Sequence, residues 1–211
     1  MVGNIQERRE TPLMRVVQGG SQPAISSVQS KAMLADRITP EARERGLKAI
    51  AGLGALLERD LFSRQEKGFE KRLEALKNSI SSLLCGDAPV FKEHGDASER
   101  LVSRNHEIRI ALSIEDGKPV LCHELESAIG VMLYMMKESE VSKRVGVLIG
   151  REEGGGRQII FISGSGMKNL GPELLLAVRS AVELLGCEFR PNVSSVTIFV
   201  PLRQDGVPLA I

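Results

Sequence analysis

The fold is decided by the stretch Ile160-Phe-Ile-Ser-Gly-Ser-Gly-Met167 and by the segment Gly171 to Gly186 that follows it. The first stretch is apolar until it ends in a Gly-x-Gly turn, which is typical of a strand and its exit. The second has helical spacing from Pro172 to Leu185, with a proline in the first turn and a glycine as its stop. Val193 to Pro201 follows as a further strand. This order of strand, helix and strand predicts a layered α/β unit.

The same alternation extends back along the chain to His106. We expect strands at His106–Ile114 and Lys118–Cys122, a helix at Glu124–Lys137, and two strands, Arg144–Ile149 and Arg157–Ile162, joined at Gly154-Gly155-Gly156. Together with the segments above, these elements predict one sheet with helices on a single face, which is an α/β sandwich.

Two apolar stripes with alternating steps of three and four residues precede this unit. They are Leu47, Ile50, Gly54, Leu57 and Leu61 in one helix, and Phe69, Leu73, Leu76, Ile80 and Leu83 in the next. The polar stretch from Ser63 to Gly68 is short enough to turn one helix back on the other, so an antiparallel helical hairpin is predicted. Two helices cannot enclose a core, and we therefore expect a homodimer with a four-helix bundle. The alternative is that the stripes pack on the rest of the same chain.

The predicted fold class is therefore α+β, an N-terminal hairpin followed by a sandwich. The expected division is a tail at 1–21, the hairpin and dimerisation region at 22–85, a linker at 86–105, the sandwich at 106–204 and a short tail at 205–211. Glycine, proline and many charges mark the linker.

The composition narrows the classes of partner and site. The formal net charge is +1 without a long run of one sign, and the chain has no Trp and one Tyr, so nucleic-acid binding is not expected. No apolar run approaches the roughly 20 residues that span a bilayer, so we expect no membrane contact and a cytoplasmic location. Cys85, Cys122 and Cys187 have no metal-ligand spacing, so they are expected to be free thiols, and no metal site is predicted.

The run Gly171-Pro-Glu-Leu-Leu-Leu-Ala-Val-Arg-Ser-Ala-Val-Glu-Leu-Leu-Gly186, followed by Ser194-Ser-Val-Thr-Ile-Phe-Val-Pro201, resembles the end of the ATP-binding domain of the histidine kinase and gyrase superfamily (GHKL). Together with the order of elements, this resemblance implies a GHKL-like sandwich. The hairpin then looks like the dimerisation and phosphoacceptor region of the same kinases.

The positions that hold MgATP in that family carry other residue types here. The resemblance places Val131 and Met135 on the magnesium-binding helix, where neither offers an oxygen ligand. It places Ile162 at the Asp that accepts the adenine amino group, and an isoleucine cannot accept a hydrogen bond. Gly164-Ser165-Gly166 looks like the glycine part of that motif, with a simple tight turn as the alternative. The lid over the phosphates is cut to Lys168-Asn169-Leu170, so no cofactor is expected.

The phosphoacceptor histidine is also missing from its expected place. Ala35-Asp36-Arg37-Ile38-Thr39-Pro40 is similar to the acceptor string of the family, with Ala35 in place of the histidine, while a helix start at Thr39 and Pro40 is the alternative. His123 resembles a second acceptor, because the following Glu124 can orient the imidazole and take its proton. A structural histidine at a helix N-terminus is the other interpretation.

These features favour a catalytically inactive pseudokinase, a histidine-kinase-like adaptor of two-component signalling that binds a response regulator or a histidine kinase. Two alternatives stay open, since fold alone does not determine function. One is a histidine phosphotransferase that uses His123, and the other is a structural or assembly protein of unrelated function.

Overall fold

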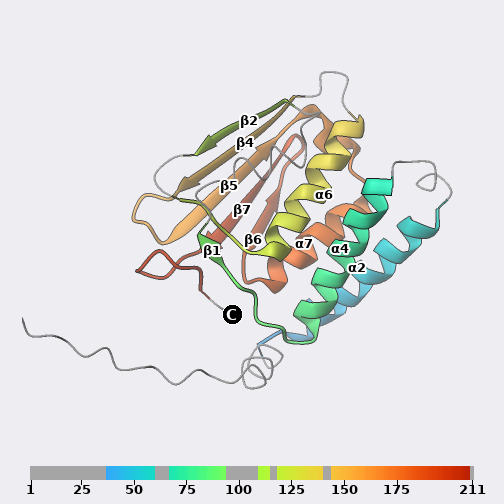
Figure 1. Ribbon diagram of the computed structural model, residues 1–211, viewed down its shortest axis with the longest axis horizontal. Helices are drawn as coiled ribbons and strands as arrows, with labels where there is room; N and C mark the ends of the chain where they lie inside the picture. Colours follow the sequence, from blue (N-terminus) through green and yellow to red (C-terminus); the bar gives the residue numbers. More distant parts are fainter. Residues whose placement is uncertain (1–36, 60–66, 94–108, 115–117, 140–143, 210–211) are drawn as a thin grey trace, which may run out of the picture.

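The structure, a computed structural model, describes residues 37–59, 67–93, 109–114, 118–139 and 144–209. Its elements form three layers: a five-stranded sheet, two central helices on one face of the sheet, and an outer pair of helices (Figure 1). The fold is α+β, with a helical hairpin followed by an α/β sandwich, which confirms the predicted fold class. None of the described helices is long and apolar enough to cross a bilayer.

The sheet has the strand order β2-β4-β5-β7-β6. Its strands are β2 (Arg109–Ile114), β4 (Arg144–Arg151), β5 (Arg157–Ser163), β6 (Glu188–Pro191) and β7 (Ser195–Pro201). β2 and β4 are parallel, and the other neighbouring pairs are antiparallel. Side chains alternate between the two faces of β5 and β7, so one apolar row from each strand lies in the core.

The central layer consists of α6 (His123–Ser139) and α7 (Pro172–Leu184). α7 has the ends that the sequence predicts, because its proline takes the first turn and Gly186 follows the helix at a φ of 69°. That left-handed conformation suits glycine. Both helices lie on the same face of the sheet, which confirms the predicted arrangement (Figure 1).

The outer layer is the hairpin of α2 (Pro40–Glu58) and α4 (Lys67–Leu84). α2 begins at a local cap, because the Thr39 hydroxyl oxygen accepts a hydrogen bond of 3.2 Å from a backbone N–H of the first turn. Pro40 takes the first helical position. Thr39 and Pro40 are therefore a helix start, the second of the two interpretations. Ala35 lies outside the described residues.

The second apolar stripe is buried within one chain. Its members, from Phe69 to Leu83, are at most 1% exposed because α4 packs against α2, α6 and α7. The first stripe differs from the prediction: Leu47 is 58% exposed, and α2 buries Ala49, Leu53 and Leu56 instead. Apolar and small residues occupy more than one side of α2, so their spacing alone left the buried side ambiguous. The hairpin and the sandwich share one hydrophobic core.

A two-stranded ribbon lies apart from the main sheet. It pairs β1 (Lys92–Glu93) with β3 (Val120–Leu121) in antiparallel orientation. β3 falls within a predicted strand, whereas β1 falls in the stretch expected to be a linker. The buried Gln158 of β5 holds this ribbon, since its side-chain oxygen accepts a hydrogen bond of 3.0 Å from the Val120 N–H and its amide nitrogen donates to the Val120 carbonyl at 3.4 Å. The start of α6 follows directly.

Candidate functional site

The position that the resemblance assigns to the adenine acceptor lies in the core. Ile162 lies in β5 at 0% exposure, paired with Val147 of β4 and Val196 of β7. The segment after β5 folds into a short 3-10 helix, η1 (Ser165–Asn169), which packs against α6. Met167 of η1 and the following Leu170 are 4% and 7% exposed and belong to the core, whereas Lys168 and Asn169 of the short lid segment are exposed.

The glycines of the degenerate motif take ordinary roles. Gly164 precedes η1 with a φ of 173°, an extended conformation open to any residue, and Gly166 is buried within η1. The Gly164 carbonyl accepts a hydrogen bond from the Met167 N–H. The segment is therefore a one-turn connection between strand and helix, close to the tight-turn interpretation.

The two positions assigned to the magnesium helix are apolar and at least partly buried. Val131 of α6 is 1% exposed, and Met135 of the same helix is partly buried against the core. Neither side chain offers an oxygen to a hard cation. The described residues also hold no group of three or more His, Cys, Asp or Glu side chains that could bind a metal ion. The residues at these positions do not fit MgATP.

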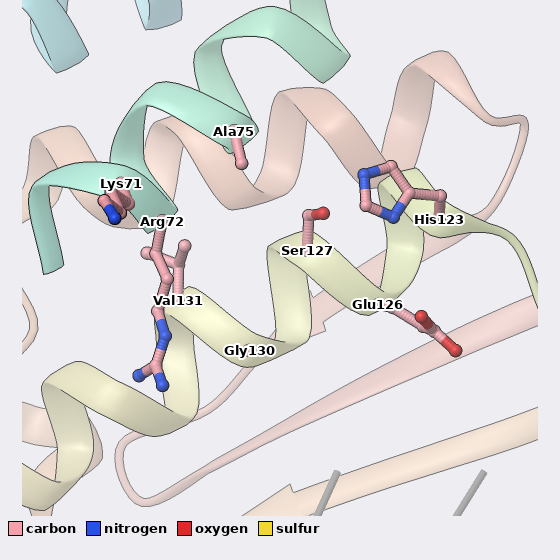
Figure 2. A pocket seen from close by; sticks show the side chains of 8 residues that line it. All are labelled: Lys71, Arg72, Ala75, His123, Glu126, Ser127, Gly130 and Val131. Atoms are coloured by element: carbon pink, nitrogen blue, oxygen red, sulfur yellow. The ribbon is translucent and has the colours of Figure 1, made fainter. Parts of the chain in front are cut away.

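A pocket of about 260 Å³ lies between α4 and α6 (Figure 2). Three features define it: cationic side chains, a histidine and a small-residue floor. The lining residues are Lys71, Arg72, Ala75, His123, Glu126, Ser127, Gly130 and Val131. The pocket exists only because the hairpin packs on the sandwich, since each helix supplies one wall.

The pocket has distinct ends. In Figure 2, Lys71 and Arg72 lie near Val131 at one end, His123 lies at the other, and the Ser127 hydroxyl is between them. From His123 to Val131 the α6 axis rises by about 12 Å. A ligand of a few heavy atoms in the middle would therefore have nitrogen donors on two sides.

The charged side chains at the pocket differ in the contacts that they make with the rest of the protein. The Arg72 guanidinium lies 4.6 Å from the centre of the Tyr134 ring, and this ring stacks on Phe69 at 5.2 Å. Glu126 is 5% exposed and points away from α4 toward the sheet (Figure 2). Within the described residues, Lys71 makes no ion pair or hydrogen bond, and its side chain is exposed.

The first turn of α6 sets the position of His123, which is exposed. Cys122, directly before it, is 0% exposed, and burial raises the pKa of its thiol. The nearby negative charge of Glu124 raises the same pKa further.

Of the residues that line the pocket, sequence reasoning named His123 and Val131 and missed the others. His94 and His106 lie outside the described residues. Lys71, Arg72 and Ser127 belong to no local sequence motif. Lys71 and Arg72 come near His123 only because α4 packs on α6. The one usable signal was the helical period of α4, which places Lys71 and Ala75 four residues apart on one side.

No family model and no curated protein matches the chain. Several solved structures are similar to it at low identity. The Acinetobacter baumannii histidine kinase AdeS is 10% identical over 63% of this chain and 78% of its own, with a TM-score of 0.48. The Erythrobacter litoralis EL346 blue-light activated histidine kinase is 18% identical over 78% of this chain and 62% of its own, with a TM-score of 0.43. A bacterial phosphotransferase is 13% identical over 83% of this chain and 97% of its own, with a TM-score of 0.32. Likeness at this level says nothing about activity, partner or substrate.

Proposed function

We propose that this chain is a cytoplasmic, histidine-kinase-like signalling adaptor of a two-component pathway, which binds other proteins and performs no ATP-dependent chemistry. The observation that supports this most is the packing of η1 against α6, with Ile162 in the core. A nucleotide needs an acceptor for the adenine amino group, an oxygen ligand for magnesium and room for its phosphates. In the GHKL-like alignment the adenine acceptor is replaced by Ile162 and the magnesium-helix positions are Val131 and Met135, while the lid over the phosphates is shortened to Lys168-Asn169-Leu170.

A calorimetric titration of the purified chain with MgATP tests the nucleotide part of the proposal. We expect no saturable heat up to millimolar nucleotide, and an active histidine kinase titrated in parallel is the positive control. Clear micromolar binding would contradict the proposal, because it would require an adenine acceptor and a phosphate site elsewhere in the chain.

The adaptor part needs a surface for protein partners, and we propose that a second copy of the chain takes one side of α2. Leu47 is 58% exposed there, and Ile50, Gly54 and Leu57 are only partly buried. These four residues recur along one side of the helix, which suits packing against another helix. Among the described residues, α4 has no exposed large apolar side chain, whereas α2 has Leu47, so α2 is the better seam.

Light scattering coupled to size-exclusion chromatography measures this association. A Leu47→Glu variant is expected to shift a dimer toward the monomer, because the new carboxylate would be buried in an apolar interface. Val193→Glu is the matched control: Val193 is 78% exposed on the turn before β7, outside the α2 surface. The interface would be refuted if the unmodified chain is a monomer, or if the Leu47→Glu variant is still a dimer.

Binding of receiver domains and kinases from the source organism can then be measured by interferometry with the unmodified chain. Saturable binding of a receiver or kinase that is unaffected by MgATP would agree with the adaptor. If none of the receivers or kinases binds, the chain is better explained as a structural or assembly protein.

A second candidate function is histidine phosphotransfer, because the exposed His123 lines a pocket that also contains Lys71 and Arg72. In that step an imidazole nitrogen attacks the phosphorus of an aspartyl phosphate on a partner. An N–P bond forms, the P–O bond breaks, the aspartate leaves as a carboxylate, and the ring proton passes to solvent. Transfer of label from a phosphorylated receiver that is lost in His123→Ala would favour this function. Label that persists on the alanine variant would exclude His123 as the acceptor.

A further inference from the structure

We propose that the pocket between α4 and α6 is a binding site for a small oxyanion, a phosphate or carboxylate group seated against Ser127 and Gly130 with Lys71 on one side and His123 on the other. This site does not depend on the adaptor proposal. It lies between α4 and α6 and includes Val131, a position that the resemblance assigns to the magnesium helix, whereas Ile162 and the residues of η1 do not line it.

The Ser127 hydroxyl is the first reason. Ser127 is 9% exposed, and its side chain points into the pocket in Figure 2. It makes no hydrogen bond within the described part of the chain. The hydroxyl is accessible from the pocket, so it can donate a hydrogen bond to a ligand oxygen there.

Two nitrogen donors flank this hydroxyl. Lys71 and His123 are both exposed and have no partner among the described residues. Their side chains extend from opposite ends of the pocket, so they can approach one bound group from two sides (Figure 2). Ammonium and imidazole N–H groups form their strongest hydrogen bonds with ionised oxygens. Arg72 adds positive charge near the Lys71 end while it remains stacked on Tyr134.

The floor of the pocket leaves room for such a group. A Cβ atom added to Gly130 would meet no atom within 4 Å, so the space beside this residue is open. Ala75 of α4 is also small. Glu126 is the carboxylate that lines the pocket, and it points toward the sheet, away from the position proposed for the anion (Figure 2).

The test is a titration of the ¹⁵N-labelled full chain with inorganic phosphate, and separately with acetate, at constant ionic strength. We expect saturable shifts of the His123 ring and of the Ser127 and Gly130 amides, with a dissociation constant on the order of 1 mM for phosphate. Saturation by phosphate alone would identify the phosphoryl group as the ligand, and saturation by acetate as well would extend the site to carboxylates.

Variants distinguish binding of the anion at this site from nonspecific attraction of anions to the protein surface. Lys71→Gln and Ser127→Ala should each weaken binding by about 10-fold, the effect of one charge-assisted hydrogen bond. Gly130→Ala should weaken it by placing a methyl group in the site. Lys77→Gln is the matched control, because Lys77 lies on the same helix outside the pocket and should not matter. Shifts that do not saturate with either anion, or that are equal in all variants, would overturn the proposal.

Discussion

At the scale of single residues, Gln158 connects the sheet to the start of α6. It is 2% exposed, and its side chain satisfies both backbone groups of Val120. Gln158→Leu should lower the free energy of unfolding by about 2 kcal/mol, because a buried N–H and C=O lose their partners. Chemical denaturation measures the loss. Gln204→Leu, at an exposed position, is the control and should change it by less than about 0.5 kcal/mol. Equal effects of both changes would show that the ribbon is held by other contacts.

Because of its two buried thiols, the protein should lose stability as the pH rises in the alkaline range. Burial raises the pKa of the Cys187 thiol to about 12, and it raises that of Cys122 as well. In the unfolded chain the thiols ionise near pH 9, whereas in the folded protein they stay protonated. Their contribution to the free energy of unfolding is therefore complete below that pH and is lost as the pH rises. For two thiols, the free energy of unfolding should fall by about 2 kcal/mol between about pH 9 and about pH 10. Replacing both by alanine should flatten this slope, and an unchanged slope would assign it to other groups.

At the scale of elements, Gly46 determines how closely α2 and α4 approach. A Cβ atom at this position would lie 2.9 Å from Leu84 Cδ2. Gly130, in α6, has no such neighbour, so Gly130→Ala should stabilise the protein by about 1 kcal/mol through helix propensity. Gly46→Ala should gain less, because Leu84 must move to make room. Thermal unfolding compares the two. Equal gains would mean that Leu84 rotates away at no cost.

The ends of elements were predictable where local chemistry determines them. The start of α7 at Pro172 and its stop at Gly186 follow from backbone preferences that act over one turn. The buried side of α2 was not predictable, because Ala49 and Leu53 compete with Leu47 and Ile50 for the same role. Which of two apolar sides is buried depends on what packs there, here α7.

At the scale of the whole molecule, the pocket depends on contacts between residues far apart in the sequence. Lys71 and His123 are brought to one site by packing of the hairpin on the sandwich, and no short motif records that contact. The hairpin itself was predictable, yet the sequence could not say whether its second stripe would face another copy or α6 and α7 of its own chain. Leu73 and Leu76 are 0% exposed within one chain, so the apolar stripe of α4 faces α6 and α7 of its own chain.

This shared core predicts that hairpin and sandwich unfold together. Tyr134, the one tyrosine of the chain, lies on α6 and stacks on Phe69 of α4, so its near-ultraviolet signal reports their contact. Far-ultraviolet circular dichroism reports all helices and strands, and the two thermal transitions should coincide. Leu53→Ala should lower both midpoints equally and cost about 2–5 kcal/mol, because Leu53 is 0% exposed between the layers. Leu47→Ala, on the same helix but 58% exposed, is the control with little effect. Loss of the tyrosine signal at a lower temperature would instead mean that the hairpin detaches first, and the pocket between α4 and α6 would then open before the sandwich unfolds.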